Sequence, residues 1–131
     1  MQTGPNLIDE NILASNTGGD VPLAIEIIGL FKEQSQIWSR MLDADLPQKQ
    51  WADAAHSLKG SALGAGAVPL ADACSQAEKR GRSEDPVSRT EAAILLSDIK
   101  DLIGPSLEAA ATLSFELNNR GHFSASNASN S

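Results

Sequence analysis

One short stretch of the chain, AAHSLKGSALGAGA at residues 54–67, holds the residue types that could do chemistry. His56 is one of only two histidines, and a neutral imidazole is a nucleophile near physiological pH. Lys59 follows one helical turn later and brings a positive charge within reach of that ring. Gly60 comes next, although glycine inside a helix costs about 1 kcal/mol relative to alanine. A nucleophile, a cation and a position without a side chain beside them together suit the transfer of a phosphoryl group to the histidine.

The helical periodicity of this stretch predicts where the histidine points. Side chains advance by about 100° per residue along a helix, which groups one set of apolar residues on a single face. That face consists of Trp51, Ala55, Leu58, Ala62 and Ala65. His56 lies about 140° from the middle of this stripe, so we expect it on the outside. Gly60 shares its side, so packing within the chain does not explain the glycine, and Leu63 and Ala67 continue the same exposed surface.

The rest of the chain predicts further helices and no strands. A short apolar segment at 7–14 ends in the polar turn SNTGGD, and Asp20 with Pro22 then suits the start of a helix. We expect that helix to end at 43–46 and the next to run from Pro47 to Gly64 or Gly66. The first of these two helices is defined by residues at three- and four-residue steps, all of them apolar except Gln34: Leu23, Ile27, Leu30, Phe31, Gln34, Trp38, Met41 and Leu42.

Two more helices complete the predicted architecture. One covers 70–80 and stops at Gly81, and a long one follows Pro86, with a kink expected at Gly104–Pro105. Four long helices with short connections predict an all-α, antiparallel four-helix bundle with a short extra N-terminal helix. We expect residues 1–119 to form this single domain and the polar residues 120–131 to be a disordered tail.

Composition narrows the class of function. A net charge of −7 argues against nucleic acid or an anionic membrane as a partner, because both require a basic surface. No apolar run is long enough to span a bilayer, and the single cysteine, Cys74, cannot form an internal disulfide. We therefore expect a cytoplasmic protein, and a monomer because its apolar stripes can be satisfied within one chain. No metal-binding motif occurs.

The stretch around His56 resembles the signature of histidine-containing phosphotransfer (HPt) domains, which act in two-component phosphorelays. The family pattern is His, any residue, Leu, Lys, Gly, then Ser or Ala, then a small residue. Six positions match it: His56, Leu58, Lys59, Gly60, Ser61 and Ala62. The segments GGD at 18–20 and LADACSQAEKRGR at 70–82 are also similar to the family, and the likeness extends over about residues 6–117.

The resemblance implies a relay intermediate rather than an enzyme. His56 would accept a phosphoryl group from the aspartyl phosphate of one receiver domain and pass it to the aspartate of another. Lys59 would neutralise the phosphoryl charge. The expected receiver-docking surface consists of Gly60, Leu63, Gly64 and Ala67. In many members a glutamine on the following helix supports the imidazole, and Gln76 and Glu78 are both candidates here.

The implied partners are response-regulator receiver domains and a hybrid sensor histidine kinase, and Mg²⁺ would be bound by the receiver, with no cofactor in this chain. The main alternative is a helical adaptor that binds a signalling partner without phosphotransfer. A hydrolase using His56, Asp53 and Ser57 or Ser61 is disfavoured, because residues so close on one helix splay apart and no GxSxG turn occurs. A kinase dimerisation domain is disfavoured because HSLKG lacks the acidic residue and proline that follow its histidine.

Overall fold

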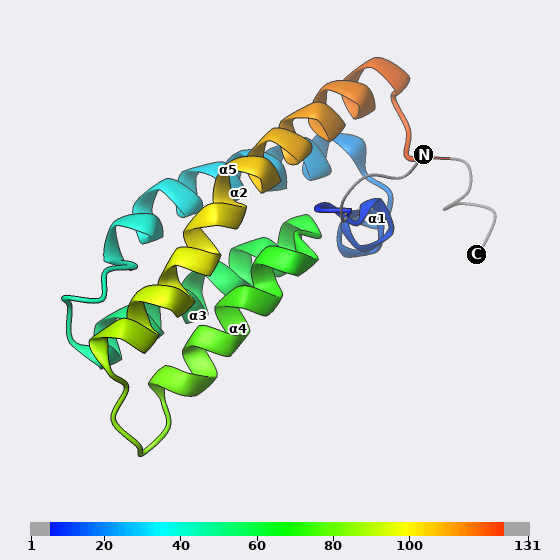
Figure 1. The fold of residues 1–131 in the computed structure, drawn as a ribbon. Helices are drawn as coiled ribbons and strands as arrows, with labels where there is room; N and C mark the ends of the chain where they lie inside the picture. The colour runs from blue at the N-terminus through cyan, green and yellow to red at the C-terminus, as the bar shows by residue number, and fades with distance from the viewer. Residues whose placement is uncertain (1–5, 125–131) are drawn as a thin grey trace.

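The computed structural model describes residues 6–124, and within that range the chain is helical and contains no strand. Its elements are α1 (Glu10–Thr17), α2 (Val21–Trp38), the 3₁₀ turn η1 (Ser39–Met41), α3 (Gln48–Ala65), α4 (Val68–Gly81) and α5 (Arg89–Arg120). Helices α2 to α5 form an antiparallel four-helix bundle (Figure 1). The short α1 lies at the end of the bundle where α3 turns into α4, which confirms the predicted architecture.

The helix ends follow local rules that were visible in the sequence. The side chain of Asp20 accepts a hydrogen bond from the backbone N–H of Leu23, and Pro22 lies in the first turn of α2. Gly66 ends α3 with φ +81°, a left-handed conformation that favours glycine. The α-helical part of α2 is shorter than expected, because the chain tightens into η1 after Trp38. Helix α5 is continuous across Pro105, so the proline does not end it.

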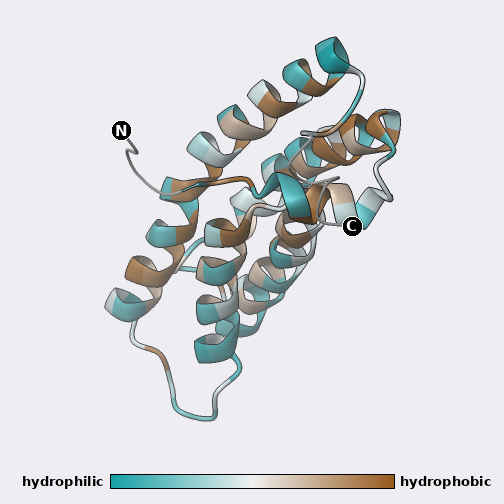
Figure 2. Ribbon diagram, turned by 90° about the vertical axis from the view of Figure 1, so that its right-hand side faces the viewer, coloured by the Kyte–Doolittle hydropathy of each residue, from teal (hydrophilic) through white to brown (hydrophobic). Residues whose placement is uncertain are grey.

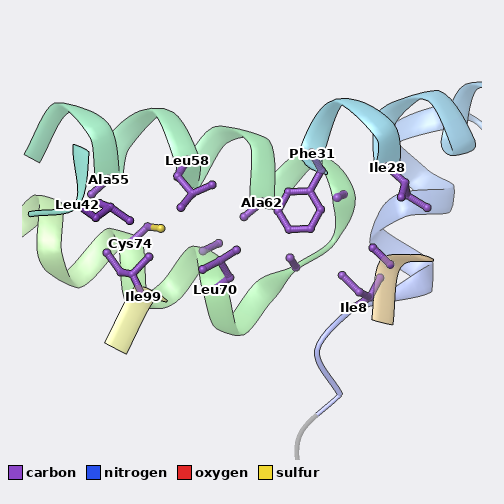
Figure 3. Close-up of a cluster of buried hydrophobic side chains, with 14 of the residues drawn as sticks. Ile8, Ile28, Phe31, Leu42, Ala55, Leu58, Ala62, Leu70, Cys74 and Ile99 are labelled. Carbon is purple, nitrogen blue, oxygen red and sulfur yellow. The ribbon is translucent and has the colours of Figure 1, made fainter. Parts of the chain in front are cut away.

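The core between α3 and α4 is made of small and aliphatic side chains. Leu58, Leu70 and Cys74 are fully buried and meet between the two helices (Figure 3). The stripe predicted for α3 is confirmed, because each of its five members is at most 2% exposed. Ala67, however, is also fully buried, which corrects its expected place on the outer surface. Brown and teal segments alternate along the long helices in Figure 2, as amphipathic helices require.

The core-facing side of α2 differs from the predicted stripe. Its buried residues are Val21, Ala24, Ile28, Phe31 and Ser35, whereas Leu23 and Leu30 are exposed. Among the other members of the predicted stripe, Phe31 and Leu42 are buried, and Ile27, Trp38 and Met41 pack against the core. The prediction is therefore wrong for Leu23 and Leu30, which lie on the outer surface of α2.

Gly81 allows α3 and α4 to approach closely at the far end of the bundle. A Cβ atom at this position would lie 2.7 Å from the ring of Trp51 and 2.9 Å from the Cβ of Ala52. Because real Cβ atoms do not approach other atoms so closely, glycine is required for this packing. The contact sets the separation of the two helices close to the turn that carries Glu78.

The folded domain extends beyond residue 119, so the tail does not begin at residue 120 as expected. Arg120 is the last residue of α5, and its guanidinium lies 3.6 Å from Oε2 of Glu10. The backbone N–H of Ser124 donates to the same oxygen at 2.8 Å, and Phe123 packs against the core. Residues 120–124 therefore belong to the folded domain, whereas the expectation for 125–131 falls outside the described residues. Within residues 6–124, none of the helices has the length and apolarity needed to cross a membrane.

Candidate functional site at His56

His56 projects from the outer side of α3, as the periodicity predicted, and its side chain is 60% exposed. Its Nδ1 atom lies 2.8 Å from Oε2 of Glu78 on α4. The Nε2 atom has no hydrogen-bonding partner among the residues that the structure describes. One ring nitrogen is therefore engaged by the protein and the other is open to an incoming group.

Glu78 is the centre of a group of charged side chains that joins α3 to α4. The Nζ atom of Lys59 donates to Oε1 of Glu78 at 2.7 Å, and Nε of Arg82 donates to Oε2 at 3.2 Å. Arg82 also reaches back to α3, where its Nη2 lies 2.9 Å from Oδ1 of Asp53. The six members of this α3–α4 charge network are Lys49, Asp53, His56, Lys59, Glu78 and Arg82.

The spacing of these residues explains why they meet. Asp53 and Lys59 lie one turn before and one turn after His56, so all three share one flank of α3. Glu78 and Arg82 are four residues apart and share one flank of α4. The connection at Gly66 and Ala67 is short, so the two helices run antiparallel and place these flanks side by side.

The electrostatic environment fixes the ionisation of Glu78. The hydrogen bond from Lys59 is the main cause that lowers its pKa from 4.5 to about 2, with smaller contributions from Arg82 and His56, while burial opposes the shift. The carboxylate is therefore ionised near neutral pH and can only accept hydrogen bonds. Because it accepts from His56, the hydrogen of a neutral imidazole belongs on Nδ1, which leaves the lone pair on Nε2.

The surface beside His56 is apolar and open. Gly60 is exposed, and a Cβ atom added to it would meet no other atom within 4 Å. Leu63 is 47% exposed, and Gly64 is partly buried. A groove of about 380 Å³ lies between α3 and α2 at this place, lined by Ile27, Leu30, Phe31, Gln34, Gly60, Ser61 and Gly64.

The structure brings together most of the residues expected at the site. His56, Lys59 and Glu78 are in contact, and Glu78 rather than the exposed Gln76 faces the imidazole. Gly60, Leu63 and Gly64 lie on the outer side of α3, but Ala67 does not. The sequence analysis missed Arg82 and the part of the groove formed by α2. The signal for α2 lay in Ile27, Leu30 and Phe31, which the sequence analysis placed on one apolar stripe and which line this groove.

No three His, Cys, Asp or Glu side chains gather closely enough to hold a metal ion anywhere in residues 6–124. Lys49 and Arg82 instead neutralise Asp53, and the hydrogen bond from Lys49 is the largest cause of its lowered pKa. The carboxylates near His56 are thus committed to cations of the same chain.

A helical bundle that presents a nucleophilic ring nitrogen beside a cation and an open surface defines a histidine phosphotransfer module. Residues 26–105 match the family model described as the Hpt domain, and the chain belongs to that family. It is a histidine phosphotransfer protein of the phosphorelay type.

A solved structure supports the same assignment. The chain is similar to the histidine phosphotransferase ShpA from Caulobacter crescentus, with 28% sequence identity and a TM-score of 0.67. The similarity covers 88% of this chain and 98% of that one. A comparison with curated protein sequences gives no significant match.

Proposed function

We propose that His56 is the phosphoryl acceptor and that it carries the phosphoryl group on Nε2. The observation that supports this assignment is the asymmetry of the ring, with Nδ1 bonded to Glu78 and Nε2 free. In the forward step the Nε2 lone pair attacks the phosphorus of an aspartyl phosphate. The N–P bond forms, the P–O bond to the aspartate breaks, and the aspartate leaves as a carboxylate. Transfer to a second receiver is the reverse of this step.

Lys59 and Glu78 act on different groups in this reaction: Lys59 acts on the phosphoryl group, and Glu78 acts on the imidazole ring. As Nε2 is phosphorylated, positive charge develops on the ring, and the carboxylate at Nδ1 stabilises that charge. The side chain of Lys59 is 27% exposed and lies one turn from His56, where its ammonium group can turn toward the phosphoryl oxygens. In this role Lys59 neutralises the transferred charge while Glu78 holds the ring.

The proposed partners are the receiver domains of response regulators and of a hybrid sensor histidine kinase. We infer that a receiver docks over Gly60, Leu63 and Gly64 and over the groove that α2 completes. The absence of a side chain at Gly60 would let the receiver's aspartate reach Nε2. The receiver would bring its own Mg²⁺, which phosphoryl transfer commonly uses. The protein would act as a cytoplasmic monomer, since His56 needs no second copy to be complete.

Phosphate labelling tests the assignment of His56. The full chain is mixed with a receiver domain that has been phosphorylated by radiolabelled acetyl phosphate, and the phosphorylated residue is located by mass spectrometry. We expect acid-labile, base-stable phosphate on His56 and none in His56→Gln. The matched control is His122→Gln, which removes the other, exposed histidine and should be labelled like the parent. Label retained by His56→Gln, or no label on the parent, would refute the proposal and favour a non-transferring adaptor.

A further inference from the structure

Arg82 occupies a position that links the residues before and after the reactive histidine. It follows Glu78 by one turn at the end of α4, where its backbone N–H donates to the carbonyl oxygen of Glu78 at 2.9 Å. Its guanidinium contacts Glu78 through Nε and Asp53 of α3 through Nη2. The side chain therefore crosses from α4 to α3 and joins two carboxylates that flank His56.

The contact with Glu78 involves the same oxygen that holds the imidazole. Oε2 of Glu78 accepts from both Nδ1 of His56 and Nε of Arg82, whereas Lys59 occupies Oε1. Lys59 alone would not decide which way the carboxylate turns, because an ammonium is a point charge on a flexible stem. The guanidinium is planar, with donors in a fixed geometry, so it can define the place of Oε2.

The network also carries a local excess of positive charge. Lys49, Lys59 and Arg82 face only two carboxylates, those of Asp53 and Glu78. The chain as a whole has a net charge of −7, so an approaching phosphoryl group otherwise meets an acidic protein. Without Arg82 the positive and negative charges of this network would be equal in number.

We propose that Arg82 is a positioning residue for phosphoryl transfer at His56. It holds Oε2 of Glu78 on Nδ1, and Asp53 holds Arg82 in that place, so the imidazole keeps the tautomer with a free lone pair on Nε2. This inference rests on the proposed function, because it concerns the reactivity of the same ring. Arg82 acts through Glu78 and need not touch the phosphoryl group.

The first measurement is the tautomer of His56, read from the ¹⁵N chemical shifts of its two ring nitrogens in the full chain. The parent should show hydrogen on Nδ1. In Arg82→Gln the carboxylate is free to turn onto Lys59, and we expect a substantial fraction of the ring to carry hydrogen on Nε2 instead. The matched control is Arg89→Gln, which also removes one cation and one ion pair, the one from α5 to Asp45 in the turn before α3, and leaves Glu78 untouched.

The second measurement is the rate of phosphorylation by phosphoramidate, a small donor that needs no docking surface. Its P–N bond breaks as the N–P bond to His56 forms, and ammonia leaves. We expect Arg82→Gln to react roughly 10- to 100-fold more slowly than Arg89→Gln, as is typical of misplaced reacting groups. Arg82→Lys should recover part of the rate, since the charge returns, but not the parent's tautomer, since one ammonium cannot span Glu78 and Asp53.

The outcomes separate this inference from the proposed function. If Arg82→Gln matches Arg89→Gln in tautomer and rate, Arg82 does not position the ring and the inference is wrong. Full recovery of both readouts in Arg82→Lys would also overturn it, because charge alone would then suffice. Failure of a phosphorylated receiver to label the parent refutes the proposed function instead, and the tautomer measurement does not depend on that result.

Discussion

Gly60 offers the sharpest test of the docking surface, because its effects on stability and on transfer should be opposite. It lies inside α3, and an added Cβ would meet no atom within 4 Å. Alanine there should therefore gain the full difference in helix propensity, about 1 kcal/mol in the free energy of unfolding. For a chain of this length that gain corresponds to a rise in Tm of roughly 3–5 °C.

A longer side chain at the same position should keep the stability but obstruct the partner. Gly60 lines the groove between α2 and α3 and lies one turn beyond His56 on the outer surface. In Gly60→Gln the side chain would project into the approach of a receiver. Displacing reacting groups by about 1 Å can lower a rate roughly 100-fold. We expect Gly60→Ala to slow transfer moderately and Gly60→Gln to slow it much further.

Gly29 provides a matched control within the same protein. It is an exposed glycine inside α2, and a Cβ there also meets nothing within 4 Å, but it lines a different groove between α2 and α5. Gly29→Ala and Gly29→Gln should therefore be stabilised like the Gly60 variants and should transfer at the parent rate. Urea unfolding gives the stability, and timed labelling from a phosphorylated receiver gives the rate. If Gly60→Gln transfers as fast as Gly29→Gln, docking does not use this surface.

Three further predictions concern stability. Gly81→Ala should destabilise the fold by about 1–3 kcal/mol, measured by urea unfolding, because the new methyl group would overlap the ring of Trp51. A chain ending at residue 120 should lose roughly 1–2 kcal/mol relative to one ending at 124, because Phe123 packs against the core, while transfer stays unchanged. The lowered pKa of Glu78 means that its ionised form stabilises the fold above pH 4.5, and that this contribution is lost as the pH falls toward about 2. Between pH 5 and pH 2, Glu78→Gln should therefore lose less free energy of unfolding than the parent does. The difference between the two losses should be at most about 3 kcal/mol, and smaller because solvent screens these charges. Equal losses would contradict the role of this ionisation.

The exposure of His56 could be predicted because α3 is regular from end to end of the relevant stretch. A fixed advance of about 100° per residue relates His56 to Leu58 and Ala62 without knowledge of any other helix. The same count failed at Ala67 because Gly66 adopts a left-handed conformation and ends the helix. Beyond that residue the backbone turns into α4 and Ala67 becomes buried, so a helical angle no longer describes its direction.

The inner face of α2 could not be chosen from its sequence, because two apolar faces compete. The predicted face runs through Leu23 and Leu30, and the buried face runs through Ala24 and Ile28, with Phe31 shared by both. Large side chains suggested the first face. The structure buries the second, because Ala24, which is fully buried, lets the helix approach its neighbours closely. Leu23 and Leu30 remain outside, and Leu30 lines the groove that Gly60 also lines.

The spacing of residues along α4 alone could not decide whether Gln76 or Glu78 contacts His56. Cys74 and Ala77 mark the buried face of α4, and that much is evident from their small size and three-residue step. Gln76 and Glu78 are the two neighbours of Ala77, so they lie about 100° to either side of it. Which side faces α3 is decided by the direction in which the chain turns through Gly66, and therefore by the handedness of the bundle. That turn places a carboxylate rather than an amide on Nδ1 of His56, and an acceptor that cannot donate allows only one tautomer of the neutral ring at this hydrogen bond.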